Sequence, residues 1–464
     1  MNPDERVLSS LQEAGRALRR GAPGASRLTD LALSRSERAD RLLRAFATLT
    51  GERARAQALQ SGDELANGLD RGPLHGIPCA VKDLFAVQGT PWRCGSAVYR
   101  DRVAAVEAAA VRKLREAGAV LVGTTSMTEL AGGPPDATIT GACRTPWDTA
   151  RWSGGSSSGS AAAVAAGAVP FALGTETWGS IMTPASFCGV TGLRPSFGRV
   201  SRAGVMTVSW SMDKVGVLAR SARDCATVLA AIAGRDPADP ATVEGTVRVV
   251  FTRSAERARA LRVGFVRENY ERWGDPEVGA AFAQARATLA AAGVPPVEAA
   301  IPPYPYEAVA ETILAAEQSA SFEGIVRDGR IGDVLDPARR GQILGGFAIG
   351  AAEYLRAQRV RTLMVRDFAR LFERFDLLLG SSTLAPAPRV EATLREIFPG
   401  GNQIEAAENL LGLPAVSVPC GFTRGGLPVG MKIVGPHLGD ADALHLAHFY
   451  QSITSWHRHM PEGW

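Results

Sequence analysis

Residues 151–176 read RWSGGSSSGSAAAVAAGAVPFALGTE, and this stretch decides which fold the sequence predicts. A loop of serine and glycine is followed by an alanine-rich apolar run and then by the strand-like segment VPFAL. A flexible linker is not expected here, because Gly/Ser linkers are rarely followed by an apolar helix and a strand. Small side chains let backbones approach closely, so we expect the alanine run to pack as a helix against a sheet.

Helical and strand-like segments alternate on both sides of this stretch. Residues 111–126, VRKLREAGAVLVGTTS, read as a helix closed by glycine and followed by a buried strand. Apolar runs of strand type return late in the chain, in FDLLLGSSTLAP (375–386), LPAVSVPCGF (413–422) and LPVGMKIVG (427–435). The alternation predicts an α/β fold in which helices cover a central sheet on both faces.

A single domain is expected over residues 1–464, because the composition marks no division into independent halves. Residues 1–70 read as an N-terminal helical layer, from apolar residues at three- and four-residue spacing. Residues 71–235 are the expected core with the candidate site. Residues 236–464 combine a variable substrate region with the C-terminal strands that complete the core, and their first part, residues 236–260, is polar and reads as a loop.

The charge pattern argues against two classes of partner. The formal net charge is +4 over 464 residues, and the basic residues are scattered among acidic ones. Nucleic acids and membrane surfaces attract long runs of basic residues, so we expect neither as a partner. The sequence carries no secretory signal pattern and no apolar run of about 18 residues, which predicts a cytoplasmic protein.

The positions of the cysteines and histidines in the sequence predict neither a disulfide framework nor a metal site. The six cysteines are widely spread and include no CxxC pair, which predicts reduced thiols. His445 and His448 could share one helix face, but no carboxylate motif surrounds them, so we expect no metal.

Lys82, in GIPCAVKDLF, has apolar neighbours that predict a buried strand end. Only four of the 51 basic residues are lysine, so arginine is the usual cation of this chain. A buried lysine is either paired or able to lose its proton, which arginine cannot do. A proton-accepting role and an ion pair with Asp83 or another acid both remain open.

Ser180 follows a strand-like segment and precedes a proline-containing helix start, within GTETWGSIMTPASFCGVTGLRPS (174–196). Backbone amides at such a turn can converge on one point and stabilise a developing oxyanion. A rival nucleophile is Ser157, because GSSSG (155–159) matches the GxSxG elbow of α/β-hydrolases. That elbow needs a preceding strand, whereas TPWDTARWSG (145–154) reads as turn-like, although His437, His445 or His457 could nominally supply the base.

These segments together resemble the amidase signature family. The resemblance is carried by five blocks in order, at residues 76–96, 154–167, 174–205, 209–225 and 409–436. It implies a large, mixed, twisted central sheet covered by helices, and a homodimer. It also implies hydrolysis of a small-molecule carboxylic amide to an acid and ammonia or an amine, with no metal or organic cofactor.

The resemblance implies a Ser-cisSer-Lys triad. Lys82 would be the base, Ser156 the bridging serine with a cis peptide bond, and Ser180 the nucleophile that forms an acyl-enzyme. Ser157 would support the triad, and the oxyanion hole would be formed by backbone amides of Thr177, Trp178, Gly179 and Ser180.

The sequence departs from the family pattern beside the nucleophile. Where the family commonly reads DTGGSIR, this chain reads ETWGSIM, with Glu176, Trp178 and Met182 at the changed positions. Backbone amides survive a change of side chain, so the oxyanion hole can persist. An aromatic side chain at residue 178 predicts a restricted pocket, and the support of the serine loop becomes an open question.

Substrate selectivity is expected to lie in residues 304–383 and 402–409, where Glu317, Tyr354 and Arg361 are either substrate contacts or helix-surface residues. One alternative function is the glutamine-hydrolysing subunit of a tRNA-dependent amidotransferase. An acid that helps hold the glutamine amino group in those proteins falls at Asn402 here, which argues against it. A catalytically silent interaction subunit is the other alternative.

Overall fold

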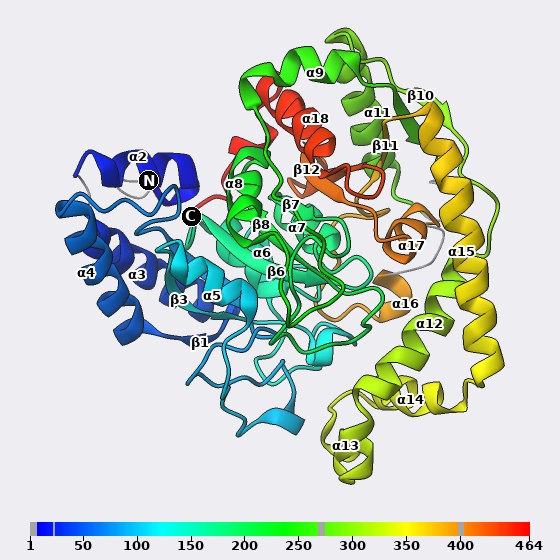
Figure 1. Ribbon diagram of the computed structural model, residues 1–464, viewed down its shortest axis with the longest axis horizontal. Helices are drawn as coiled ribbons and strands as arrows, with labels where there is room; N and C mark the ends of the chain where they lie inside the picture. The colour runs from blue at the N-terminus through cyan, green and yellow to red at the C-terminus, as the bar shows by residue number, and fades with distance from the viewer. Residues whose placement is uncertain (1–6, 22–23, 268–273, 398–402) are drawn as a thin grey trace.

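One large sheet runs through the molecule and helices surround it, as the computed structural model shows (Figure 1). The structure describes residues 7–21, 24–267, 274–397 and 403–464. Within them the main sheet has eleven strands in the order β1-β3-β2-β6-β8-β7-β12-β13-β11-β9-β10. Their bounds are β1 Phe46–Leu49, β2 Pro78–Lys82, β3 Val120–Thr125, β6 Phe171–Glu176, β7 Thr191–Arg194, β8 Lys214–Ala219, β9 Val263–Val266, β10 Val297–Ala299, β11 Leu377–Ser381, β12 Ala415–Phe422 and β13 Pro428–Val434.

Strand directions confirm the predicted mixed sheet. Strand β2 runs parallel to β3 and β6, and β9 runs parallel to β10 and β11. The strands between these groups, from β6 through β8, β7, β12 and β13 to β11, pair antiparallel. The central strands are buried on both faces, which explains their nearly continuous apolar runs.

Helices pack around this sheet. Helices α6 and α7 contact its middle strands, α3 and α4 contact the β1–β3 edge, and α12, α14 and α15 lie together at the right in Figure 1. Their bounds, with the remaining α-helices, are α2 Leu11–Arg19, α3 Ala25–Leu43, α4 Gly51–Ala66, α5 Ala109–Glu116, α6 Ser158–Ala165, α7 Met182–Cys188, α8 Ala222–Ile232, α9 Ser254–Ala260, α11 Pro276–Ala291, α12 Tyr306–Ser321, α13 Glu323–Arg327, α14 Pro337–Gly345, α15 Ala351–Arg374, α16 Leu394–Ile397, α17 Gln403–Leu410 and α18 Asp440–Ile453.

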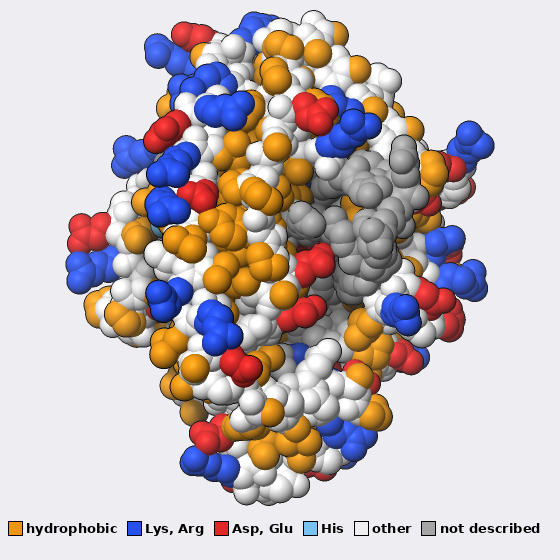
Figure 2. Space-filling model, turned by 90° about the vertical axis from the view of Figure 1, so that its right-hand side faces the viewer, with side chains coloured by type: hydrophobic (Ala, Val, Ile, Leu, Met, Phe, Trp, Pro, Cys, Tyr) orange, Lys and Arg blue, Asp and Glu red, His pale blue; other side chains and the backbone are white. Residues whose placement is uncertain are grey.

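The helices account for two further features of the molecule. Apolar and charged side chains are interspersed on the face that carries α15 (Figure 2), where Leu355, Leu363 and Val365 are exposed. No helix among the described residues is long and apolar enough to cross a lipid bilayer.

Most sequence-predicted elements are present at their expected places. Helix α5 ends before Gly118, which adopts φ +79°, and β3 follows it. The six cysteines are free and buried, as expected for reduced thiols.

Three elements differ from the sequence prediction. The N-terminal helical layer also contributes β1, which pairs antiparallel with β3. The segment read as turn-like forms a hairpin of β4 (Arg144–Thr145) and β5 (Asp148–Trp152). The polar segment 236–260 ends in helix α9. Each of these elements is short, so local pattern carries little signal for it.

Helix α6 confirms the close packing predicted from its small residues, since all eight of its residues are buried. Gly159 donates its N–H to Ser126 O at 2.9 Å. A Cβ on Gly159 would overlap Ala45 O and lie 2.5 Å from Ser126 N, both rigid backbone atoms. The glycine is therefore required by this contact.

We expect Gly159→Ala to lower the free energy of unfolding by about 1–3 kcal/mol, because the backbone must move to admit the methyl group. Urea unfolding monitored by circular dichroism measures the change. Gly62→Ala in α4 is the control: nothing lies within 4 Å of its added Cβ, so this variant should be unchanged or more stable. Equal midpoints for Gly159→Ala and wild type would contradict the packing argument.

Candidate active site

Lys82 is fully buried at the end of β2. Its Nζ donates to Ser156 Oγ at 2.7 Å and to Thr175 Oγ1 at 2.9 Å. Among the described residues, no carboxylate oxygen lies within ion-pair distance of Nζ, and Asp83 instead accepts from Gly95 N. Burial lowers the pKa of Lys82 to about 7, against the attraction of Asp213, Cys94 and Glu176. This environment favours a proton-accepting lysine over the ion pair with Asp83.

The serine loop brings Ser156 to Lys82. The peptide bond between Gly155 and Ser156 is cis. Ser157, the next residue, donates its backbone N–H to Ser180 O at 3.3 Å, which connects the serine loop to the segment around Ser180.

The environment of Ser157 disfavours the GxSxG elbow. Ser157 Oγ donates to Thr175 O at 3.1 Å and accepts from Thr175 N at 3.3 Å, and the side chain is fully buried. Two of the candidate bases are engaged elsewhere, with Nδ1 of His445 against Ser254 Oγ and Nδ1 of His437 against Gly412 O. Ser157 Oγ is therefore bonded to the backbone of β6, and its supporting role in the triad stays a prediction.

The segment around Ser180 joins the end of β6 to the start of α7. Gly179 adopts φ +79°, a conformation that favours glycine, and Ser180 is 8% exposed. Thr177 Oγ1 donates to Asp213 Oδ1 at 2.6 Å, and the main-chain carbonyl of Thr177 accepts from Lys214 Nζ at 3.4 Å. These contacts fix the loop formed by residues 177–180, which we call the oxyanion loop.

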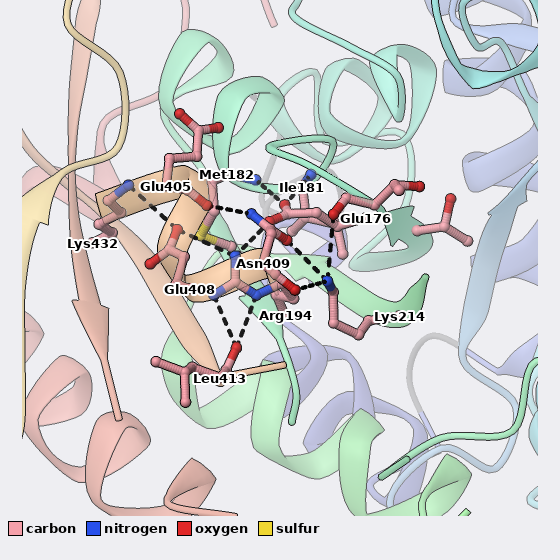
Figure 3. Close-up of polar contacts among 12 residues, drawn as sticks. Glu176, Ile181, Met182, Arg194, Lys214, Glu405, Glu408, Asn409, Leu413 and Lys432 are labelled. Atoms are coloured by element: carbon pink, nitrogen blue, oxygen red, sulfur yellow. Dashed lines mark hydrogen bonds and ion pairs between the residues drawn. The ribbon is translucent and has the colours of Figure 1, made fainter. Parts of the chain in front are cut away.

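Glu176 supports the same loop from behind (Figure 3). Its Oε2 accepts from the backbone N–H groups of Ile181 at 2.7 Å and Met182 at 3.0 Å. Its Oε1 accepts from Arg194 Nη1 at 2.6 Å. Burial opposes ionisation, but Arg194 and Lys214 outweigh it and lower the pKa of Glu176 to about 2. The glutamate that replaces the family's aspartate therefore supports the loop as an anion, and Met182 is simply buried in the core.

Arg194 also joins the loop to more distant parts of the chain. It donates to Glu408 Oε1 at 3.2 Å and, through Nε and Nη2, to Leu413 O at 3.1 and 2.9 Å. Glu408 in turn accepts from Lys432 Nζ at 3.3 Å. Every charged side chain of this cluster is fully buried, so each charge is balanced by its ion-pair partners rather than by solvent.

A cavity of about 380 Å³ opens beside Ser180. The indole of Trp178 lines it. The restriction of the pocket by this side chain stays a prediction. The other lining residues come from the oxyanion loop, α7, α12, α14, α16, α17 and nearby loops: Ala131, Gly132, Thr177, Thr183, Phe187, Val208, Glu307, Glu311, Leu314, Gln318, Arg339, Gln342, Thr383, Leu384, Ala385, Ile397 and Glu405.

Arg339 is the buried cation of this cavity, with 4% of its surface exposed. Nη1 donates to the side-chain oxygens of Gln318 and Gln342, and Nη2 donates to Leu130 O at 2.8 Å. Nε has no hydrogen-bond partner, and no acid of the described residues lies at ion-pair distance. Burial lowers the pKa of Arg339 to about 10, which leaves the side chain a cation at neutral pH.

Glu317, Tyr354 and Arg361 do not line the cavity. Glu317 accepts from Ser209 Oγ, from Ser211 N at 3.2 Å and from Tyr354 OH at 2.7 Å, and Arg361 donates to Ser211 Oγ and O at 2.9 Å. They connect α12 and α15 to the loop that leads to Asp213. Asn402 lies outside the described residues.

Four site residues have no clear signal in the sequence. Thr175 is one of many strand threonines, and Arg339 is one arginine among many. Gln318 and Glu405 lie in segments expected to face the pocket, but no pattern distinguishes them from their neighbours.

Comparisons with known proteins find similarity over nearly the whole chain. A family model described as Amidase matches residues 27–444. A glutamyl-tRNA(Gln) amidotransferase subunit from Thioalkalivibrio sulfidiphilus (strain HL-EbGR7) is 37% identical over 489 residues, covering 98% of this chain and 99% of the relative.

Two solved structures are similarly close. One, from work on a vestigial protein complex and the evolutionary origins of an s-triazine catabolic enzyme, has a TM-score of 0.88 at 32% identity and covers 96% of this chain and 98% of its own. The native peptide amidase from Stenotrophomonas maltophilia has a TM-score of 0.84 at 30% identity, with 97% and 98% covered.

These relatives correct one prediction. The expectation that nucleic acid plays no part is wrong, because full-length relatives are subunits of an enzyme named for a tRNA. Scattered surface charge is a poor guide here, since it reports only on direct binding of polyanions by this chain. The same relatives favour the alternative function, an amidotransferase subunit, over a generic small-amide hydrolase. The homodimer expected from the resemblance stays a prediction.

We expect Glu176→Gln to lower the free energy of unfolding by about 3 kcal/mol, because it leaves the buried Arg194 with only part of its counter-charge. Chemical denaturation measures the loss. The control is Glu391→Gln, the same change in the exposed pair with Arg389 (3.7 Å), where the expected effect is below about 1 kcal/mol. Similar losses in both variants would show that the buried pair adds nothing.

Proposed function

We propose that this chain, which belongs to the amidase family, is the glutamine-hydrolysing subunit of an amidotransferase. It would hydrolyse the side-chain carboxamide of glutamine through an acyl-enzyme on Ser180. The observation that carries the proposal is the cavity that both Ser180 and the buried cation Arg339 line.

The proposed reaction begins with neutral Lys82. Its Nζ takes the proton of Ser156 while Ser156 takes the proton of Ser180, and Ser180 Oγ attacks the amide carbon. The contact of 2.7 Å between Lys82 Nζ and Ser156 Oγ supports the first transfer. Thr175 accepts a second hydrogen bond from Nζ at 2.9 Å and so orients the amine.

The oxyanion loop is proposed to stabilise the tetrahedral intermediate. Backbone N–H groups between Thr177 and Ser180 would bind the negative oxygen, held in place by Glu176, Asp213 and Lys214. The proton returns through Ser156 to the departing nitrogen, which leaves as ammonia. Water then hydrolyses the ester on Ser180 by the same relay in reverse order.

Arg339 supports glutamine as the substrate. A buried guanidinium is costly unless it is paired, and its planar set of donors suits a carboxylate. Glutamine brings a carboxylate for Arg339 and an ammonium group for the carboxylates of Glu307 and Glu311, which line the same cavity.

Trp178 favours a second candidate, a small amide without the amino-acid group. Its indole lines the cavity with Phe187, Leu314 and Leu384, a surface suited to a flat apolar acyl group. A silent interaction subunit is disfavoured, because a protein without catalysis would not need a buried lysine held against two hydroxyls.

We expect a fluorophosphonate to label Ser180, with a rate that rises with pH through about 7 as Lys82 loses its proton. Intact-mass analysis and peptide mapping measure the rate and the position. Ser180→Ala should lose the label, and Lys82→Ala or Ser156→Ala should slow it at least about 100-fold. Label on Ser157, or none, would contradict the triad.

We expect Arg339→Gln to lower kcat/KM for glutamine about 100-fold, mainly through KM, because the substrate carboxylate loses a buried partner. The variant should keep the labelling rate of Ser180, which needs no carboxylate. Arg340→Gln, the adjacent arginine outside the cavity, is the control and should keep the wild-type KM. Unchanged glutamine kinetics in Arg339→Gln would favour the small-amide candidate, for which butyramide is the comparison substrate.

A further inference from the structure

Glu405 lies in the first turn of α17 and lines the cavity with Ser180. A Cβ added to Gly179 would collide with Oε1 of Glu405 and lie 3.3 Å from its Cδ. The carboxyl group of Glu405 therefore lies against Gly179 of the oxyanion loop.

Glu405 and Glu408, one turn apart, point in different directions. The side chain of Glu408 points into the Arg194 cluster, whereas that of Glu405 points away from it (Figure 3). Only the main-chain carbonyl of Glu405 faces back, where it accepts from Asn409 Nδ2 at 2.9 Å. The charge of Arg194 is thus directed at Glu176 and Glu408.

The charged groups around Glu405 come from several elements. Burial raises the pKa of Glu405 to about 8, against the attraction of Lys432 and Arg194 and with the repulsion of Glu176 and Glu408. The group is therefore mostly protonated at neutral pH. The charged residues that face it or share its cavity are Glu176 of β6, Arg194 of β7, Lys432 of β13, Glu408 of α17, Glu307 and Glu311 of α12, and Arg339 of α14.

We propose that Glu405 controls catalysis as an uncharged carboxylic acid beside the oxyanion loop, and that its ionisation stops the attack of Ser180. A protonated carboxyl tolerates, and can donate to, a developing oxyanion, as buried acids do in other oxyanion sites. A carboxylate in the same place repels that charge across a medium with little water. The inference rests on the oxyanion site proposed above.

Two groups with opposite requirements then set the working pH range. Lys82 must be deprotonated, so activity rises as pH increases through about 7. Glu405 must be protonated, so activity falls as pH increases through about 8. The rate should follow a narrow bell-shaped curve, with Lys82 on the acid side and Glu405 on the alkaline side.

The test is the rate of fluorophosphonate labelling of Ser180 between pH 5.5 and 9.5, corrected for hydrolysis of the reagent. Wild type should show both limbs, and Glu405→Gln should lose the alkaline limb, labelling at least about tenfold faster than wild type at the highest pH. Its acid limb should remain. Glu391→Gln, the same change at an exposed acid that does not line the cavity, is the control and should keep both limbs.

The outcomes separate this inference from the proposed function. No label on Ser180 of wild type would refute the proposed triad, and the role of Glu405 with it. Labelling with an alkaline limb that persists in Glu405→Gln would refute the role of Glu405 alone. If Glu405→Gln does not fold, Glu405→Asp is the test variant. The pH at which its labelling rate falls on the alkaline side should differ from that of wild type. An identical pH for this fall would overturn the inference.

Discussion

The buried ion pair between Glu176 and Arg194 is the constraint on which the rest of the site depends. Glu176 ends β6 and Arg194 ends β7, two strands that are both paired to β8. The carboxylate of Glu176 also accepts both backbone N–H groups at the start of α7. One side chain therefore fixes the two ends of the loop that carries Ser180, and a loop held at both ends keeps its amides oriented without reorganisation.

The same cluster explains the state of Lys82. Arg194 and Lys432 are neutralised by Glu176 and Glu408, so two of the acids near the site are already occupied. Lys82 is left with two hydroxyl partners, and burial without a close counter-ion lowers its pKa. A lysine with a carboxylate at ion-pair distance would stay protonated and could not act as a base.

The proposed substrate side of the cavity is built differently from the proposed catalytic side. Lys82, Ser156 and the oxyanion loop belong to the sheet or to segments packed directly on it, whereas helices α12, α14 and α17 supply much of the remaining lining. Glu317 of α12 and Arg361 of α15 join their helices to the loop that ends at Asp213. A change of substrate can therefore arise in the helices while the sheet keeps the chemistry, which suits a family whose similar members carry different names.

The sequence by itself determined the α/β class and the strands around the site, because small residues and apolar runs leave a local pattern. The triad of Lys82, Ser156 and Ser180 came from the resemblance to a family and stays a prediction. The sequence did not determine β1 or the β4–β5 hairpin, whose segments are short. Nor did it indicate that Glu176 would pair with Arg194, or that Thr175, Arg339 and Glu405 would join the site of the nucleophile. Only the tertiary structure decided these contacts, because ion pairs and cavity walls join residues that are distant along the chain, and their charge states depend on burial that no local pattern records.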